Sequence, residues 1–325
     1  MKIKDIYQLA VEMGKTFDPR GDEVNRLLEE RHKEYDRMND DEKSFYDEEN
    51  LTNPYNDTRL LFGEGEQVVK SAICGIDMET PEILLVDRLR EKGSRIDMII
   101  SHHPQGSAKA DLHNVMHVQS DMMEGAGVPI NIAEGLMEDR ISEVKRGLMP
   151  INHQRAVDAA RLLDIPFMCV HSPADNMVSH YLEKIFAQTP YRTVQDVIDI
   201  LMEVPEYQQA KRFKAGPTIV SGDKKRRAGK IFIKMTGGTA GSVKSYEKLA
   251  AAGVGTIIGM HMADNHRKAA RDNHINVVIA GHMASDSLGI NLFLDELEKK
   301  GMEIIPAAGL IRVKRDGWNT LRVSR

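Results

Sequence analysis

The chain has 325 residues, of which 41% are apolar and 29% are charged, a balance that is ordinary for a globular protein with a substantial core. Its 44 Lys and Arg residues against 49 Asp and Glu residues give a formal charge of −5, which argues against nucleic acid as the main partner. The sequence shows no signal-peptide pattern and no apolar run near the roughly 20 residues of a membrane span, so we expect a cytoplasmic protein with no membrane contact.

Residues 1–52 are predicted to be a helical N-terminal region that carries a charged arm. Apolar residues recur at helical spacing between Ile6 and Met13, and a second periodic segment begins at Val24. The segment 29–49 is almost entirely polar or charged, which is typical of a solvated helical face rather than of a binding site.

From residue 66 onward, predicted strands and helices alternate. A strand at 68–77, a helix at 81–93 and a strand at 95–101 form a β-α-β unit, for which we expect a parallel strand pair. Further helices are predicted at 112–127, 153–164, 178–188, 194–204, 243–253 and 287–301, and further strands at 128–135, 165–170, 230–235, 254–260, 276–281 and from 303 onward. This alternation is typical of a mostly parallel α/β protein. Cys74 and Cys169 each lie in a predicted strand, which favours buried thiols in a reducing compartment over a disulfide or a redox pair.

A polar and basic stretch around 205–229 interrupts the alternation, so we place the boundary between two α/β lobes near residues 205–215. The predicted lobes are 53–205 and 206–325. The basic run at 224–227 is more typical of a solvated turn than of a nucleic-acid contact in an acidic chain.

Histidines follow directly after three strands that are predicted to be buried. These residues are His102, His103, His171 and His282. Because ligand sites in open parallel α/β sheets lie outside the carboxyl ends of the strands, we expect these imidazoles to lie in one layer. One such histidine would be unremarkable, but three strand ends of this kind are hard to obtain by chance.

Two carboxylates accompany these histidines at a fixed spacing. Asp175 lies four residues after His171, and Asp286 lies four residues after His282. Imidazole nitrogen and carboxylate oxygen form the ligand set of Zn, Mn, Fe or Co. Each residue alone is more simply a hydrogen-bonded histidine or a helix cap. Together they favour a metal site formed by His102, His103, Asp175, His282 and Asp286.

The adjacent histidines predict two ions rather than one. Successive side chains of an extended segment diverge, so His102 and His103 do not easily bind a single ion. Pro104 restrains His103 to an extended conformation. Two neighbouring ions, roughly 3.5–4 Å apart and bridged by a carboxylate such as Asp175, would accommodate both imidazoles.

Two further patterns are less specific. The glycine-rich segment 236–242 lies between a predicted strand and a predicted helix, and it lacks the Lys-Ser/Thr ending of a P-loop. A tight loop that lets the backbone pass close to the site is favoured there, with phosphate binding as the alternative. His113 and His117 are four residues apart, and we favour a cleft mouth or a solvated face over chelation for them.

These motifs resemble the NIF-three family (NGG-one-interacting factor three), whose members include proteins called type 2 GTP cyclohydrolases. The resemblance begins near Asn53, where "NPYNDTRLLFG" loosely matches the Trp-Asp-Asn-x-Gly-Leu opening of the family. Closer matches are the histidine pair of "DMIISHHP", the His-x-x-x-Asp of "HSPADN", the loop "MTGGTAGS" and the closing "AGHMASD". Order and spacing agree throughout.

The resemblance implies a two-lobed, three-layer α/β/α fold with mostly parallel or mixed sheets, a metal cleft between the lobes, and a ring-shaped homohexamer. It also implies a dinuclear site with ligands at His102, His103, Asp175, His282 and Asp286 and with His171 beside it. A further family histidine partly matches His266, with His261 or Asp264 as substitutes. The family usually has glutamate at the position of Asp286, and the arm at 20–50 resembles an insertion.

Two functional hypotheses follow. In the first, the protein is a metal-dependent hydrolase of a small molecule with a cyclic, phosphoester or amide-like group, in which His171 or His266 orients ligands or moves protons. In the second, it is a metal-binding assembly or regulatory protein without turnover. Nucleic-acid association through the basic loops is a weaker third reading.

Overall fold

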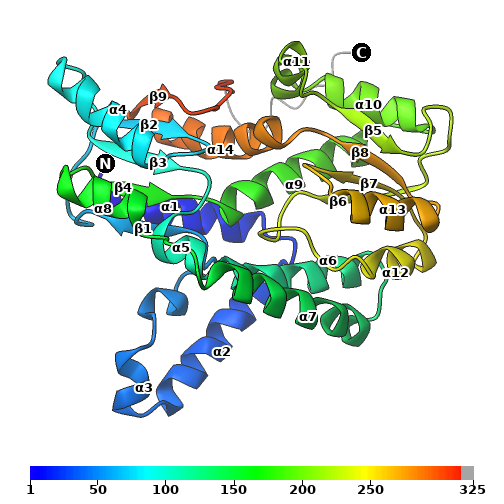
Figure 1. Ribbon diagram of the computed structural model, residues 1–325, viewed down its shortest axis with the longest axis horizontal. Coiled ribbons are helices and arrows are strands. Elements are labelled where there is room, and N and C mark those ends of the chain that lie inside the picture. The colour runs from blue at the N-terminus through cyan, green and yellow to red at the C-terminus, as the bar shows by residue number, and fades with distance from the viewer. Residues whose placement is uncertain (316–325) are drawn as a thin grey trace.

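In the computed structural model, residues 1–315 are described, and they form an α/β protein with two separate sheets (Figure 1). The first sheet has the order β1-β4-β3-β2-β9, with β1 at Arg59–Phe62, β2 at Ser71–Gly75, β3 at Met98–Ser101, β4 at Phe167–Cys169 and β9 at Glu303–Pro306. All its pairs are parallel except β1 with β4. The parallel pairing of β2 with β3 confirms the predicted β-α-β unit.

The second sheet has the order β5-β8-β7-β6 and again one antiparallel edge, where β5 pairs with β8. Its strands are β5 at Thr218–Ser221, β6 at Lys230–Lys234, β7 at Val254–Gly259 and β8 at Asn276–Ile279. The last strand of the chain, β9, does not join this sheet but pairs with β2 of the first one. The segment 206–325 therefore contributes to both sheets.

Helices cover both faces of each sheet, as the predicted α/β/α layering requires. Alternate residues of a strand point to opposite faces, so Ile257 and Ile258 of β7 enter different hydrophobic cores. One core is shared by both sheets and contains α1 (Ile3–Thr16), α9 (Ser172–Gln188), α10 (Val194–Met202), α11 (Pro205–Arg212) and α14 (His282–Lys299). α9 and α14 pack against each other near the middle of the molecule (Figure 1).

The outer faces are covered by other helices. The first sheet packs against α4 (Thr80–Glu91) and α8 (Arg155–Leu162). The second sheet packs against α6 (Val118–Gly125), α7 (Ile130–Leu148), α12 (Ser245–Ala251) and α13 (Asp264–Asp272). The short helices α5 (Gly106–Ala110) and η2 (Leu112–His117) lead into α6. No described helix combines the length and apolarity that crossing a membrane requires.

Several sequence predictions need correction. The predicted strand at 128–135 is wrong, because Pro129 instead precedes the long helix α7. Ala133, Met137 and Ile141 are buried at four-residue spacing, which is the helical period that the short apolar run concealed. The edge strands β1 and β5 and the helix α11 were not predicted, since they are short and the two strands are only partly buried.

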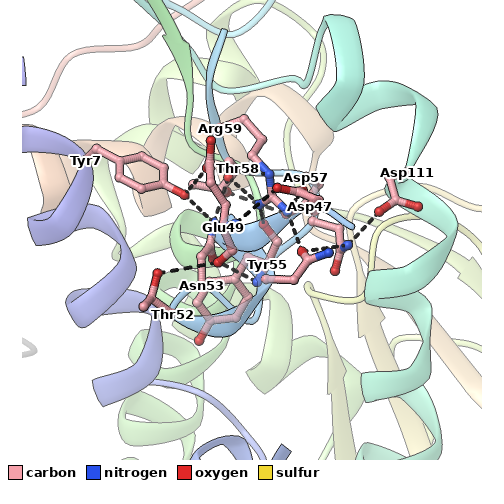
Figure 2. Close-up of polar contacts among 12 residues, drawn as sticks. Tyr7, Asp47, Glu49, Thr52, Asn53, Tyr55, Asp57, Thr58, Arg59 and Asp111 are labelled. Carbon is pink, nitrogen blue, oxygen red and sulfur yellow. Dashed lines mark hydrogen bonds and ion pairs between the residues drawn. The ribbon is translucent and has the colours of Figure 1, made fainter. Parts of the chain in front are cut away.

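The charged arm is helical, as predicted. α2 (Glu23–Arg37) and α3 (Asp40–Ser44) project from the body, and Val24 is the one buried residue that they contain (Figure 1). The short helix η1 (Glu48–Leu51) returns the chain to the body. There the buried Arg59 contacts the Asp47 and Glu49 carboxylates and donates to the Tyr55 and Thr58 carbonyls (Figure 2). This network holds segment 47–59 in place.

Candidate metal centre

The histidines that follow the predicted strands come together at one place. His102 and His103 lie at the end of β3, His171 lies between β4 and α9, and His282 begins α14 after β8. The ring centroids are 5.2 Å apart for His102 and His103, 4.9 Å for His102 and His171, and 5.2 Å for His103 and His282. Because β8 belongs to the second sheet and the other strands to the first, both sheets contribute to the cluster.

Asp175 and Asp286 lie one helical turn into α9 and α14 and face the imidazoles. The Asp286 Oδ2 atom is 3.3 Å from His103 Nε2 and 3.4 Å from His282 Nε2, and its Oδ1 atom is 3.6 Å from His102 Nε2. The Asp175 Oδ1 atom is also 3.6 Å from His102 Nε2. Ligand atoms about 2.0–2.1 Å from a tetrahedral ion are separated by roughly 3.3 Å, so these spacings suit atoms that share a metal.

Four atoms of this cluster that could ligate a metal are buried and have no hydrogen-bond partner among the described residues. They include His102 Nε2, Asp175 Oδ1 and both carboxylate oxygens of Asp286. Buried polar atoms in native proteins are nearly always paired, so four such atoms at one place call for a binding partner. Three overlapping triads have ligand atoms within 4.8 Å of one another: His102–His103–His171, His103–His282–Asp286 and His102–Asp175–Asp286. The cluster can therefore hold metal ions.

Groups behind the histidines fix which nitrogen faces the cluster. The Nδ1 atom of His102 is 3.0 Å from the Val170 carbonyl, and Nδ1 of His103 is 2.7 Å from Asp77 Oδ1. The Nδ1 atom of His171 is 2.7 Å from Asp57 Oδ2. A donated Nδ1–H leaves the Nε2 lone pair of each ring free to bind a metal.

Asp57 and Asp77 were not found by sequence reasoning. Asp77 follows β2 by two residues, so the rule that located the histidines at strand ends would also have found it. Asp57 lies in the irregular segment before β1 and is fully buried, where it also accepts from the Ser172 hydroxyl at 2.7 Å. Only the tertiary fold brings it to His171, 114 positions later.

The cluster strongly perturbs the pKa values of its members. Burial lowers the pKa of His102 to about 4 and raises the pKa of Asp175 to about 8. Burial opposes the charge of His103 too, but the carboxylates of Asp286 and Asp77 outweigh it and raise the pKa of that imidazole to about 10. The surrounding imidazoles, led by His102, overcome the effect of burial and hold the pKa of Asp286 far below its ordinary value. Such perturbation is typical of functional sites.

The remaining predicted histidines lie around this cluster. His261 is its neighbour, with its ring 4.9 Å from that of His282. His266 lies farther along, on α13, where its Nδ1 atom is 3.2 Å from the Tyr246 hydroxyl. Asp264 is paired with Arg267 on the surface of the same helix. Of these three residues, His261 and His266 line the cavity that opens onto the cluster.

This cavity has a volume of about 80 Å³, opens to solvent, and is also lined by His171, Asp175, His282 and Asp286. The glycine-rich segment 236–242 forms a loop along its wall, with positive φ angles at Gly237 and Gly238. His113 and His117 lie outside it, on the 3-10 helix η2, where a four-residue spacing does not place two side chains on one face.

The structure is similar to the crystal structure of a NIF3 superfamily protein from Sphaerobacter thermophilus, with 29% sequence identity and a TM-score of 0.69 over 78% of this chain and 92% of that one. It is also similar to reduced HcgD from Methanocaldococcus jannaschii, with 14% identity and a TM-score of 0.49 over 76% and 87% of the two chains. A Bacillus cereus protein related to NIF3 matches with 12% identity and a TM-score of 0.40 over 88% and 96%. No family model and no curated protein matches the sequence. The first of these similarities confirms the resemblance that the motifs indicated: in sequence and fold the chain is similar to a NIF3 superfamily protein.

Proposed function

We propose that the protein binds two divalent metal ions in the His/Asp cluster and is a metal-dependent hydrolase of a small molecule. The observation that carries the proposal is the set of buried, unpaired donor atoms beside an open cavity. One ion would be held by His103, His282 and Asp286, and the other by His102, Asp175 and Asp286. Asp286 faces both groups and therefore suits the bridging role that the sequence suggested for Asp175. The ligand types fit Zn, Mn, Fe or Co.

The residues around the ions suit hydrolytic chemistry. Bound ions of this kind lower the pKa of a coordinated water toward neutrality and offset negative charge on substrate oxygens. His171 is held by Asp57 and lines the cavity, so it can orient a ligand or move a proton. His266 also lines the cavity and is the second candidate for proton transfer. The cavity opens to solvent, so a small molecule with a cyclic, phosphoester or amide-like group can reach the cluster from outside.

Metal analysis and an activity screen test this function together. Elemental analysis of the purified chain should find about two divalent ions per subunit, and His102→Ala with His103→Ala should abolish that binding. Phosphoester, nucleotide and cyclic-amide substrates would be screened with Mn, Zn, Co and Fe. Turnover should be lost in Asp175→Ala but not in Asp272→Ala, a change at an exposed carboxylate outside the site.

Two outcomes would contradict the hydrolase proposal. A content of fewer than one ion per subunit would contradict the proposed metal centre itself. Stoichiometric metal without turnover on any substrate class would instead favour the alternative, a metal-binding assembly or regulatory protein.

Assembly and location are also part of the proposal. The resemblance to the NIF-three family supports a ring of six copies. Burial raises the pKa of the Cys74 thiol and raises that of Cys169 to about 12, so both are inert thiols of the kind found in a reducing cytoplasm.

A further inference from the structure

The cavity at the His/Asp cluster is also lined by a positively charged side chain. Lys234, the last residue of β6, lines the cavity together with the glycine-rich loop 236–242. The loop backbone comes close to the ammonium group, since a Cβ atom added at Gly241 would lie 3.3 Å from Lys234 Nζ. The carboxylates that line the cavity, Asp175 and Asp286, both belong to the His/Asp cluster.

The backbone of Lys234 pairs with β7, but its ammonium group has no hydrogen bond or ion pair to any described residue. Arg140, the cation whose charge acts on Lys234, is engaged, because its Nη1 atom donates to Glu143 at 2.8 Å and its Nε atom donates to the Ala240 carbonyl at 2.9 Å. A lysine that is partly withdrawn from water is normally paired with a carboxylate. Burial, reinforced by Arg140, lowers the pKa of Lys234 to about 8, which reflects this missing partner.

The loop 236–242 beside Lys234 offers backbone N–H groups that can donate further hydrogen bonds to an anion. Its carbonyl groups are occupied from outside, since Gln119 Nε2 donates to the Gly237 and Thr239 carbonyls at 2.6 Å and 2.8 Å. Arg140 occupies the Ala240 carbonyl. The peptide N–H groups of Gly238 and Ala240 have no hydrogen-bond partner within residues 1–315. A loop held by its carbonyls with unused N–H groups is a preformed site for an anion.

We propose that Lys234 and the loop 236–242 form a binding subsite for a phosphate group carried by the molecule on which the metal centre acts. A tetrahedral oxyanion uses one ammonium and several N–H donors at once, which a planar carboxylate does less fully. The substrate class is then a phosphorylated small molecule whose scissile group lies at the His/Asp cluster while its phosphate lies at Lys234. This inference rests on the proposed function only where it calls the bound molecule a substrate. The anion subsite itself does not need the metal ions.

Binding of inorganic phosphate to the full chain, measured by calorimetry, tests the subsite. The metal-free protein, prepared with a chelator, is used first so that phosphate cannot bind to metal ions. Lys234→Met should weaken phosphate binding about tenfold or more, whereas Lys234→Arg should retain most of it. Lys230→Met is the matched control, because Lys230 lies on the same strand outside the cavity and donates to the Ala126 carbonyl.

The outcomes separate this inference from the proposed function. Phosphate binding by metal-free protein that depends on Lys234 supports the subsite even if no hydrolysis is ever found. Equal binding by wild-type protein and Lys234→Met, or tighter binding of acetate than of phosphate, would overturn it. Loss of metal in Lys234→Met would also count against it, because Lys234 is assigned no metal ligation.

The pH dependence gives a second readout, with sulfate as a probe because its charge is constant. The ammonium of Lys234 is charged below its pKa of about 8, so sulfate binding should be complete below that pH and weaken as the pH rises through it. The charged and titratable groups that act on Lys234 are Arg140, His261 and His266, and the pKa values of the two histidines are lowered, that of His266 to about 4. Lys234→Arg should bind sulfate equally at pH 7 and pH 9. A wild-type profile as flat as that of Lys234→Arg would contradict the assignment.

Discussion

At the scale of single residues, the pairing of Asp57 with His171 shows how the site is supported from behind. Asp57 is fully buried and accepts from His171 Nδ1 at 2.7 Å and from the Ser172 hydroxyl at 2.7 Å. Burial alone would raise the pKa of Asp57, but His171 outweighs it and the pKa is lowered. The carboxylate therefore stays charged and holds the ring with Nε2 toward the cluster.

The change Asp57→Asn should weaken metal binding without removing it. The amide keeps the shape of the side chain but loses the charge that orients His171, and loss of such a supporting partner typically costs roughly 10- to 100-fold in metal affinity. The affinity would be measured by competition with a chelator. Asp272→Asn is the control and should bind metal like the wild type. Unchanged affinity in Asp57→Asn would show that His171 does not act through this pair.

At the scale of elements, the contact between α9 and α14 sets the width of the candidate metal centre. Gly289 lies three residues after Asp286, and a Cβ atom there would come within 2.2 Å of the Ala174 carbonyl oxygen next to Asp175. Only glycine allows the two helix backbones to approach this closely. The close approach of the helices places Asp175 and Asp286 at the same cluster, where the short Asp286 side chain reaches three imidazoles.

Gly289→Ala should push the two helices apart and weaken metal binding. Overpacking of this kind costs about 1–3 kcal/mol in the free energy of unfolding. Adding Asp286→Glu to Gly289→Ala should restore part of the metal affinity, because the longer side chain spans the wider gap. Denaturant unfolding and chelator competition provide the two measurements.

The control for this change is Gly135→Ala, at an exposed position of α7 with nothing within 4 Å of the added carbon. It should stabilise the protein by up to about 1 kcal/mol through helix propensity and leave metal binding unchanged. Wild-type metal affinity in Gly289→Ala would show that the helix contact does not set the geometry of the site.

At the scale of the whole molecule, one core holds both sheets and therefore both halves of the site. The shared core contains Ile100 of β3, Ile258 of β7 and Val278 of β8, together with residues of α9 and α14. The returning strand β9 ties the end of the chain to the first sheet. Relative movement of the two sheets would separate His282 from His103, so the metal centre depends on this core.

The proposed ring of six copies is tested by the mass of the protein in solution. Light scattering coupled to gel filtration should give six times the 36.5 kDa of one chain. Exposed apolar side chains on α4, at Leu84 and Leu85, are candidates for burial between copies, so Leu84→Glu with Leu85→Glu should lower the mass. A monomer of the wild-type chain at micromolar concentration would contradict the hexamer.

The sequence by itself determined the alternation of strands and helices and the position of His102, His103, His171 and His282 after buried strands, because hydrophobic periodicity and strand-to-helix order are local properties. The same local rules missed the edge strands and took the start of α7 for a strand, because a short apolar run has no distinct period. Only the tertiary structure decided which groups meet. Asp57, Gly289 and Lys234 owe their roles to neighbours far away in the chain, and no local pattern encodes such contacts.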